Sequence, residues 1–71
     1  MMTRQEFAAR IQQARIARGL TQAEAAARLG TPQPRIAEYE SGFRTPPVLR
    51  LIEIITTLEY DPAIIFPEFF P

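Results

Sequence analysis

The 71-residue chain contains no cysteine, no histidine and no lysine. Without cysteine it can form neither a disulfide nor a thiolate zinc site. Without histidine it lacks the usual general base at neutral pH and the commonest metal ligand. These absences argue against hydrolytic or metal-dependent chemistry, so we expect no enzyme, no bound metal and no cofactor.

Long apolar runs are also missing. No uninterrupted stretch approaches the roughly 20 residues that span a bilayer, and the segment from Met1 to Glu6 carries no apolar signal core. We therefore expect a cytoplasmic protein that makes no membrane contact. A chain of this length makes one domain with a small core.

The formal net charge is zero, but the charge is unevenly distributed. Residues 1–44 hold seven arginines and four glutamates, whereas residues 45–71 hold one arginine and four acidic residues. This asymmetry predicts a basic face for one partner and an acidic, apolar remainder for another role. All eight basic residues are arginine, whose planar fork matches phosphates and guanine edges. A genome that prefers arginine to lysine explains this bias equally well.

Turn signals divide the chain into helical segments. The first begins with the capping-box pair Thr3 and Glu6 and ends at Gly19. Its apolar positions recur at helical spacing and define a buried stripe of Phe7, Ile11 and Ala14. Arg15 lies at the edge of this stripe, so part of its charge faces inward and needs a carboxylate partner.

The segment from Leu20 to Tyr39 is the most informative in the chain. It predicts two short helices hinged at Gly30, and the first of them begins with a second capping box, Thr21 and Glu24. Helices this short are marginal alone and must pack together. A short helix pair with a glycine turn outlines a helix-turn-helix, whose second helix lies in the major groove of DNA.

The second helix of this pair has prolines in its first turn, at positions 32 and 34. We expect Thr31 or Gln33 to cap it, with the regular helix beginning near Pro34. Ile36 and Tyr39 point into the core by their spacing. The outer face, which a DNA-reading helix would use, then carries Gln33, Pro34, Arg35 and Glu38.

A fourth helix follows Pro46 and Pro47, which suit its first turn. Its apolar arc is broader than one core face needs, with a stripe of Val48, Leu51, Ile52, Ile55 and Leu58 flanked by Leu49 and Ile54. A short helix capped by Asp61 opens the apolar tail, residues 61–71. Either this tail forms an interface such as a dimer contact, or it folds back onto the domain's own core.

From Phe7 to Phe66 the sequence resembles the lambda-repressor-like helix-turn-helix domains of the Cro/C1 or XRE type. The resemblance rests on Arg15, Gly19-Leu20-Thr21-Gln22, Ala25, Leu29-Gly30, Ile36, Glu40, Gly42, Arg44 and Pro46. It implies an all-α, compact five-helix bundle that binds double-stranded operator DNA as a homodimer. The domain would span the whole of residues 1–71.

The resemblance also implies roles for single residues. Base edges would be contacted by Gln33 and Pro34, with Arg35 and Glu38 near them. Phosphates would be contacted by Gln22, Ser41 and Arg44. Arg15 and Glu40 would form an internal ion pair between the first helix and the end of the third.

Several positions depart from the family pattern. Pro34 offers only apolar contact, for example with a thymine methyl, and Glu38 can only accept, for example from cytosine N4. Phe43 stands where the family often has a basic residue, and Glu59-Tyr60 replaces a glycine-containing turn. We expect a sequence-specific DNA-binding regulator of transcription. The alternatives are an antitoxin whose tail holds a toxin, and a protein-interaction module that does not read DNA.

Overall fold

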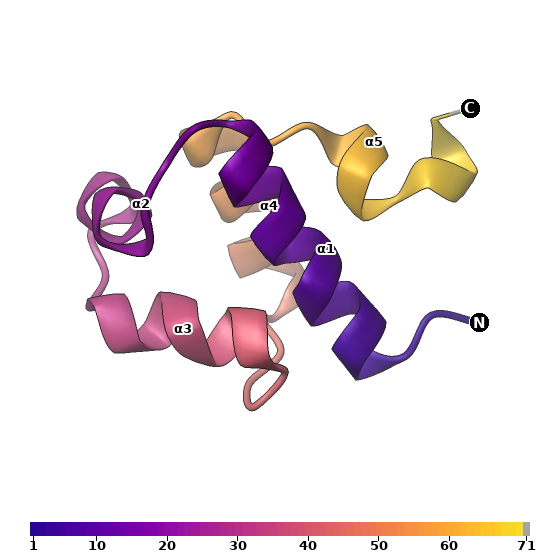
Figure 1. Cartoon of the computed structure of the whole chain (residues 1–71), viewed down its shortest axis with the longest axis horizontal. Coiled ribbons are helices and arrows are strands. Elements are labelled where there is room, and N and C mark those ends of the chain that lie inside the picture. The colour runs from indigo at the N-terminus through magenta and orange to yellow at the C-terminus, as the bar shows by residue number, and fades with distance from the viewer. Residues whose placement is uncertain (71) are drawn as a thin grey trace.

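The chain folds into helices whose ends coincide with the turn signals of its sequence (Figure 1). The computed structural model describes residues 1–70, and Pro71 lies outside the described residues. The elements are α1 (Arg4–Ala17), α2 (Gln22–Leu29), α3 (Gln33–Ser41), α4 (Val48–Leu58), α5 (Pro62–Ile65) and a 3₁₀ helix, η1 (Pro67–Phe69). The predicted all-α, five-helix fold is confirmed for the described residues.

Two capping boxes fix where α1 and α2 begin. The hydroxyl of Thr3 accepts from the Glu6 N–H at 3.1 Å, and the hydroxyl of Thr21 accepts from the Glu24 N–H at 3.0 Å. Each glutamate returns the contact by accepting from the N–H of its threonine. This bond to Thr21 lowers the pKa of Glu24. Both predicted capping boxes are confirmed.

Left-handed residues end α2 and α4. Gly30 has φ +70°, and the Thr31 N–H then donates to the Ala26 carbonyl at 3.0 Å. Glu59 adopts the same conformation with φ +55°, although it carries a side chain. The turn after α4 therefore keeps the geometry of a glycine turn without a glycine, at a cost of roughly 1–2 kcal/mol.

The start of α3 differs from the prediction. Pro32 is the N-cap residue, and neither Thr31 nor Gln33 caps the helix. No side chain accepts from the first turn, and the Arg35 N–H donates instead to the Pro32 carbonyl at 3.0 Å. Proline at position 34 disfavours helical dihedrals at Gln33 but does not forbid them in a first turn. The helix therefore includes Gln33, one residue earlier than expected.

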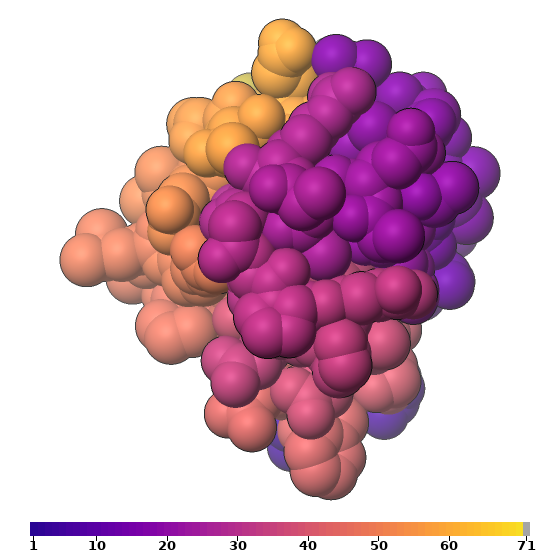
Figure 2. Space-filling view, turned by 90° about the vertical axis from the view of Figure 1, so that its left-hand side faces the viewer, coloured from indigo at the N-terminus to yellow at the C-terminus, as the bar shows by residue number. Residues whose placement is uncertain are grey.

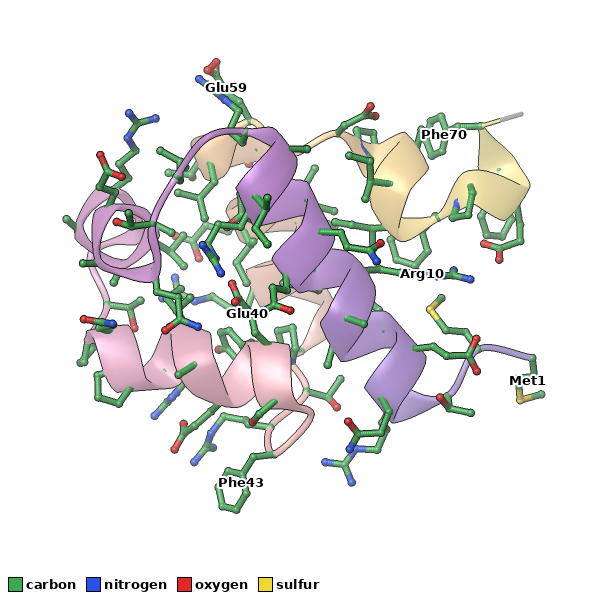
Figure 3. All side chains as sticks on the ribbon, viewed as in Figure 1. Met1, Arg10, Glu40, Phe43, Glu59 and Phe70 are labelled. Carbon is green, nitrogen blue, oxygen red and sulfur yellow. The ribbon has the colours of Figure 1, made fainter. Side chains whose placement is uncertain are left out.

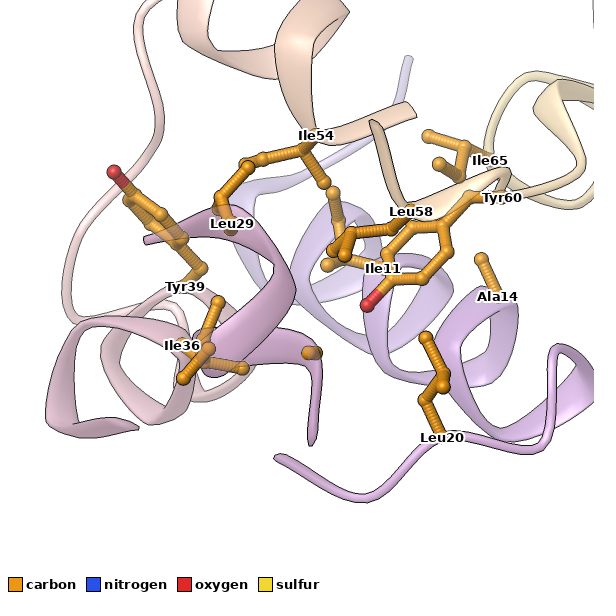
Figure 4. Close-up of a cluster of buried hydrophobic side chains, with 12 residues drawn as sticks. Ile11, Ala14, Leu20, Leu29, Ile36, Tyr39, Ile54, Leu58, Tyr60 and Ile65 are labelled. Atoms are coloured by element: carbon orange, nitrogen blue, oxygen red, sulfur yellow. The ribbon is translucent and has the colours of Figure 1, made fainter. Parts of the chain in front are cut away.

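All five helices contribute to one hydrophobic core (Figure 4). Ala25 and Ala26 are almost fully buried, and α2 contacts both α3 and α4. The predicted core positions Ile36 and Tyr39 are confirmed, with 3% and 4% exposure. The largest fully buried side chains are Ile54, Leu58 and Ile65.

The apolar arc of α4 is rotated relative to the predicted stripe. Ile54, expected at the edge, is buried, whereas Val48 and Ile52, expected at the centre, are 69% and 52% exposed. Instead, the side chains of Ile54 and Leu58 pack into the core, which also contains residues of α1 and α2. Three large apolar side chains of α4 therefore remain on the surface, namely Val48, Leu49 and Ile52.

The tail divides at Phe66. Ile65 is fully buried against the domain, and the ring of Phe66 lies 6.1 Å from that of Phe7. Arg10, between α1 and the tail in Figure 3, donates to the Ile65 carbonyl at 3.2 Å and forms an ion pair with Glu68. Phe69 and Phe70 stay exposed.

Among residues 1–70, none of the helices combines the length and the apolar character that crossing a bilayer requires.

Candidate nucleic-acid interface

The outer face of α3 is the exposed surface of the helix pair. Figure 1 shows α2 and α3 on one side of α1, with α5 and the tail on the other. In Figure 2, which looks at that first side, α3 lies uncovered at the surface. Gln33, Pro34 and Arg35 are exposed, and Glu38 is half-buried beside them. The structure therefore brings together the four side chains predicted to contact bases.

Arg15 and Glu40 form a buried ion pair between α1 and the end of α3. Arg15 donates through Nε to Glu40 Oε2 at 2.7 Å and through Nη2 to Oε1 at 2.9 Å. Its third nitrogen donates to the Leu20 carbonyl at 2.8 Å. The hydrogen bond with Glu40 raises the pKa of Arg15, so the guanidinium stays charged. In Figure 3, Glu40 lies between α1 and α3, where this pair ties the two helices together.

Gln22 connects this ion pair to the surface. It is the first residue of α2, is half-buried, and donates through Nε2 to Glu40 Oε1 at 3.1 Å. A side-chain amide nitrogen carries two N–H groups, so one donor is not used by Glu40. The amide is thus held in one orientation by a buried carboxylate. This is the kind of support that a phosphate-binding side chain needs.

Two arginines meet on one carboxylate oxygen at the outer face of α3. Arg35 Nε and Arg44 Nε each lie 3.2 Å from Glu38 Oε1. The three side chains are 43%, 47% and 32% exposed, for Arg35, Arg44 and Glu38 in turn. The spacing of Arg35 and Glu38 along a helix indicates one of these pairs. Sequence reasoning missed the pair with Arg44, because that pair depends on how the following loop folds.

The loop after α3 folds back onto the last turn of the helix. The Ser41 hydroxyl donates to the Glu38 carbonyl at 3.2 Å, and the Arg44 N–H donates to the same carbonyl at 3.2 Å. The Phe43 N–H donates to the Ser41 hydroxyl at 3.3 Å. Ser41, predicted to contact a phosphate, thus uses its hydroxyl within the loop.

Gly42 is the residue that permits this loop. Its φ is +82°, and a Cβ there would come within 2.8 Å of the Gln5 side chain. The loop therefore passes closely over α1, and it exposes the ring of Phe43 at its tip, at the lower edge of Figure 3. Arg44 follows Phe43 in this loop, and its side chain lies next to Glu38.

The side chains of this face are suited to binding anions. Its donors are guanidinium and amide groups, which match phosphates and the acceptor edges of bases. Within residues 1–70 no group of three or more acidic side chains is placed to hold a metal ion. The face offers hydrogen bonds and positive charge to a ligand.

Comparisons with known proteins agree with this geometry. A helix-turn-helix family model matches residues 11–65, which include α2, α3 and the loop to Arg44. No curated protein matches the chain. Among solved structures, the restriction-modification controller protein C.AhdI from Aeromonas hydrophila is similar, with 25% identity and a TM-score of 0.77. The similarity covers 89% of this chain and 91% of that one.

Proposed function

Since this chain belongs to the helix-turn-helix family of the Cro/C1 type and is a DNA-binding transcriptional regulator, we propose that it docks α3 in the major groove of an operator. One observation carries the proposal: the exposed donors of α3 are flanked in the sequence by two groups suited to hold phosphates. Gln22 stands at the start of α2, before α3, and Arg44 stands in the loop after it.

The first turn of α3 would read the bases. In a helix-turn-helix, the N-terminal residues of the recognition helix contact base edges. Gln33 is the first residue of α3 and is exposed, so its amide can pair with adenine N6 and N7. Arg35 carries the donors that guanine O6 and N7 accept. Pro34 offers apolar contact alone, which suits a thymine methyl.

Phosphate contacts from α2 and from the loop after α3 would fix the docking register. Gln22 lies in the first turn of α2, where backbone N–H groups and the helix dipole also favour an anion. Arg44 supplies a guanidinium from the loop after α3. The Ser41 hydroxyl could donate to a phosphate only by leaving its hydrogen bond to the Glu38 carbonyl.

The protein would act as a homodimer, because two copies related by a two-fold axis match a symmetric operator. Exposed apolar groups large enough for such a contact lie on α4 and in the tail, namely Val48, Leu49, Ile52, Phe69 and Phe70. Burial of these side chains between two copies would remove them from water. The tail, residues 61–71, would then pack against its own domain through Ile65 and Phe66, and against the partner copy through Phe69 and Phe70.

The similarity to a restriction-modification controller protein favours a regulator of that kind. The sequence of its operator would be identified by selecting bound duplexes from a random pool.

A salt titration tests the proposal. The affinity for a labelled duplex should fall steeply as salt rises, by a slope of about 0.9 per phosphate contact. Arg44→Ala should reduce that slope by about one contact and weaken binding to every sequence. The matched control is Arg18→Ala, since Arg18 is paired with Glu59, which lies at the opposite edge of Figure 3 from Phe43.

Two outcomes contradict the proposal. One is the absence of binding to any duplex at low salt. The other is an equal loss of affinity in both variants, which would reflect net charge rather than a contact at Arg44. If the protein does not bind DNA but binds a protein partner tightly, the alternative of a protein-interaction module that does not read DNA is correct.

A further inference from the structure

Glu38 is the acidic side chain on a face that the proposed function turns towards a polyanion. Its carboxylate does not stand alone, because Oε1 lies 3.2 Å from the Nε atoms of both Arg35 and Arg44. The arginine pair and the carboxylate together carry one net positive charge instead of two. An unpaired carboxylate on this face would repel phosphate, so the way it is paired decides its effect.

The contacts leave the outer ends of both guanidinium groups unused by Glu38. Each arginine approaches the carboxylate through Nε, the atom nearest the side-chain stem. The terminal Nη1 and Nη2 groups are the donors that form a two-point contact with guanine O6 and N7. Glu38 can therefore hold Arg35 in place while that arginine contacts a base.

The same carboxylate weakens arginine contacts with DNA that lack this two-point geometry. An arginine that leaves Glu38 to reach a nearby phosphate exposes the carboxylate to the negative backbone. An arginine that stays with Glu38 meets an arbitrary phosphate with its charge partly neutralised. Either way, binding to unrelated sequences gains less than two free arginines would give.

We propose that Glu38 is a specificity-determining positioning residue: its carboxylate orients Arg35 and Arg44 and lowers the affinity of this face for unrelated DNA. The inference rests on the proposed docking of α3. It differs from a role for Glu38 as a base reader, in which the carboxylate itself accepts from cytosine.

The test compares the wild type with Glu38→Gln, Glu38→Asp and Glu53→Gln. Glutamine keeps the size and an acceptor oxygen but removes the charge, and aspartate restores the charge. Glu53→Gln is the matched control, because Glu53 pairs with Arg50 at the same three-residue spacing on α4. The probes are the duplex consensus selected from a random pool and a scrambled duplex of the same length and composition. Fluorescence anisotropy across a range of salt gives the dissociation constants.

We expect Glu38→Gln to bind the scrambled duplex about fivefold to tenfold more tightly at low salt, with a salt slope steeper by about 0.9. Affinity for the consensus duplex should change less, so the ratio of the two affinities falls. Glu38→Asp should lie near the wild type, and Glu53→Gln should leave the ratio unchanged. Thermal melting of each variant shows whether folding is preserved, and it has no bearing on the ratio.

Other results overturn the inference while leaving the proposed function intact. These are an unchanged ratio in Glu38→Gln, an equal effect of Glu53→Gln, or a selected consensus in which Glu38→Gln alters one base preference. The last result would make Glu38 a base reader. Failure of the wild type to bind either duplex would overturn the proposed function, and the inference with it.

Discussion

Gln22 and Arg15 donate to the same oxygen of one buried carboxylate, Glu40 Oε1, at 3.1 and 2.9 Å. A side chain on the proposed DNA face therefore shares an anchor with the ion pair that joins α1 to α3. Docking register and folding depend on one group, so changes at Glu40 should affect both.

Glu40→Ala should lower the free energy of unfolding by about 3–5 kcal/mol, because it leaves the Arg15 guanidinium buried without a partner. Urea denaturation measures this change. The double variant Arg15→Met, Glu40→Leu should recover most of the loss, since it removes both charges and fills similar volume. A double variant as unstable as Glu40→Ala would contradict the account.

Gln33→Ala should change which bases are preferred and leave the salt dependence unaltered. Loss of a two-point contact with one adenine costs about 1–3 kcal/mol of discrimination at that position. Selection of duplexes by the variant, followed by sequencing, shows the relaxed position. Gln13→Ala is the matched control, because Gln13 is an exposed glutamine of α1. An identical consensus from Gln33→Ala and the wild type would exclude Gln33 as a base reader.

Stability should fall between pH 10 and pH 12. Burial, followed by the nearby charge of Glu40, raises the pKa of Tyr60 to about 12, above its ordinary value of 10. The folded state then holds the phenol proton more tightly than the unfolded state, so stability is complete below pH 10 and is lost as the pH rises towards 12. The loss amounts to about 2–3 kcal/mol.

Denaturation at a series of alkaline pH values measures this effect. Tyr60→Phe should remove most of the dependence, and Tyr39→Phe, at another buried tyrosine, should retain it. If both variants keep the same alkaline slope, Tyr60 is not its source.

Ile52→Asp should dissociate a homodimer and leave the monomer folded, because Ile52 is 52% exposed on α4. Sedimentation equilibrium measures the association, and thermal melting measures folding. Ile16→Asp provides the control, since Ile16 is a similarly exposed isoleucine, at 61%, on α1. A wild type that is monomeric at every concentration, or equal dissociation in both variants, would contradict the proposed contact.

The features that the sequence predicted most accurately are those that depend on residues close together in the chain. The capping boxes at Thr3 and Thr21 follow from a three-residue spacing, and the structure contains both. Gly30 ends α2 as predicted, since a left-handed residue is needed there. The pattern over Leu20 to Tyr39 therefore identified the helix pair and its inward face.

Features that depend on competing local preferences or on tertiary packing were not accessible in this way. The two prolines of α3 left its cap ambiguous, and Pro32 took a position assigned to Thr31 or Gln33. The broad apolar arc of α4 did not reveal which edge is buried. The ion pair between Glu38 and Arg44 forms only because Gly42 turns the loop back onto α3.

Methylation interference on the selected duplex tests most directly whether α3 lies in the major groove. Dimethyl sulfate modifies guanine N7 in the major groove and adenine N3 in the minor groove. We predict that methylation of guanine N7, at positions related by a two-fold axis, blocks binding, whereas methylation of adenine N3 at the same half-sites is tolerated. Binding blocked by adenine N3 alone, with every guanine N7 freely methylated, would contradict the claim.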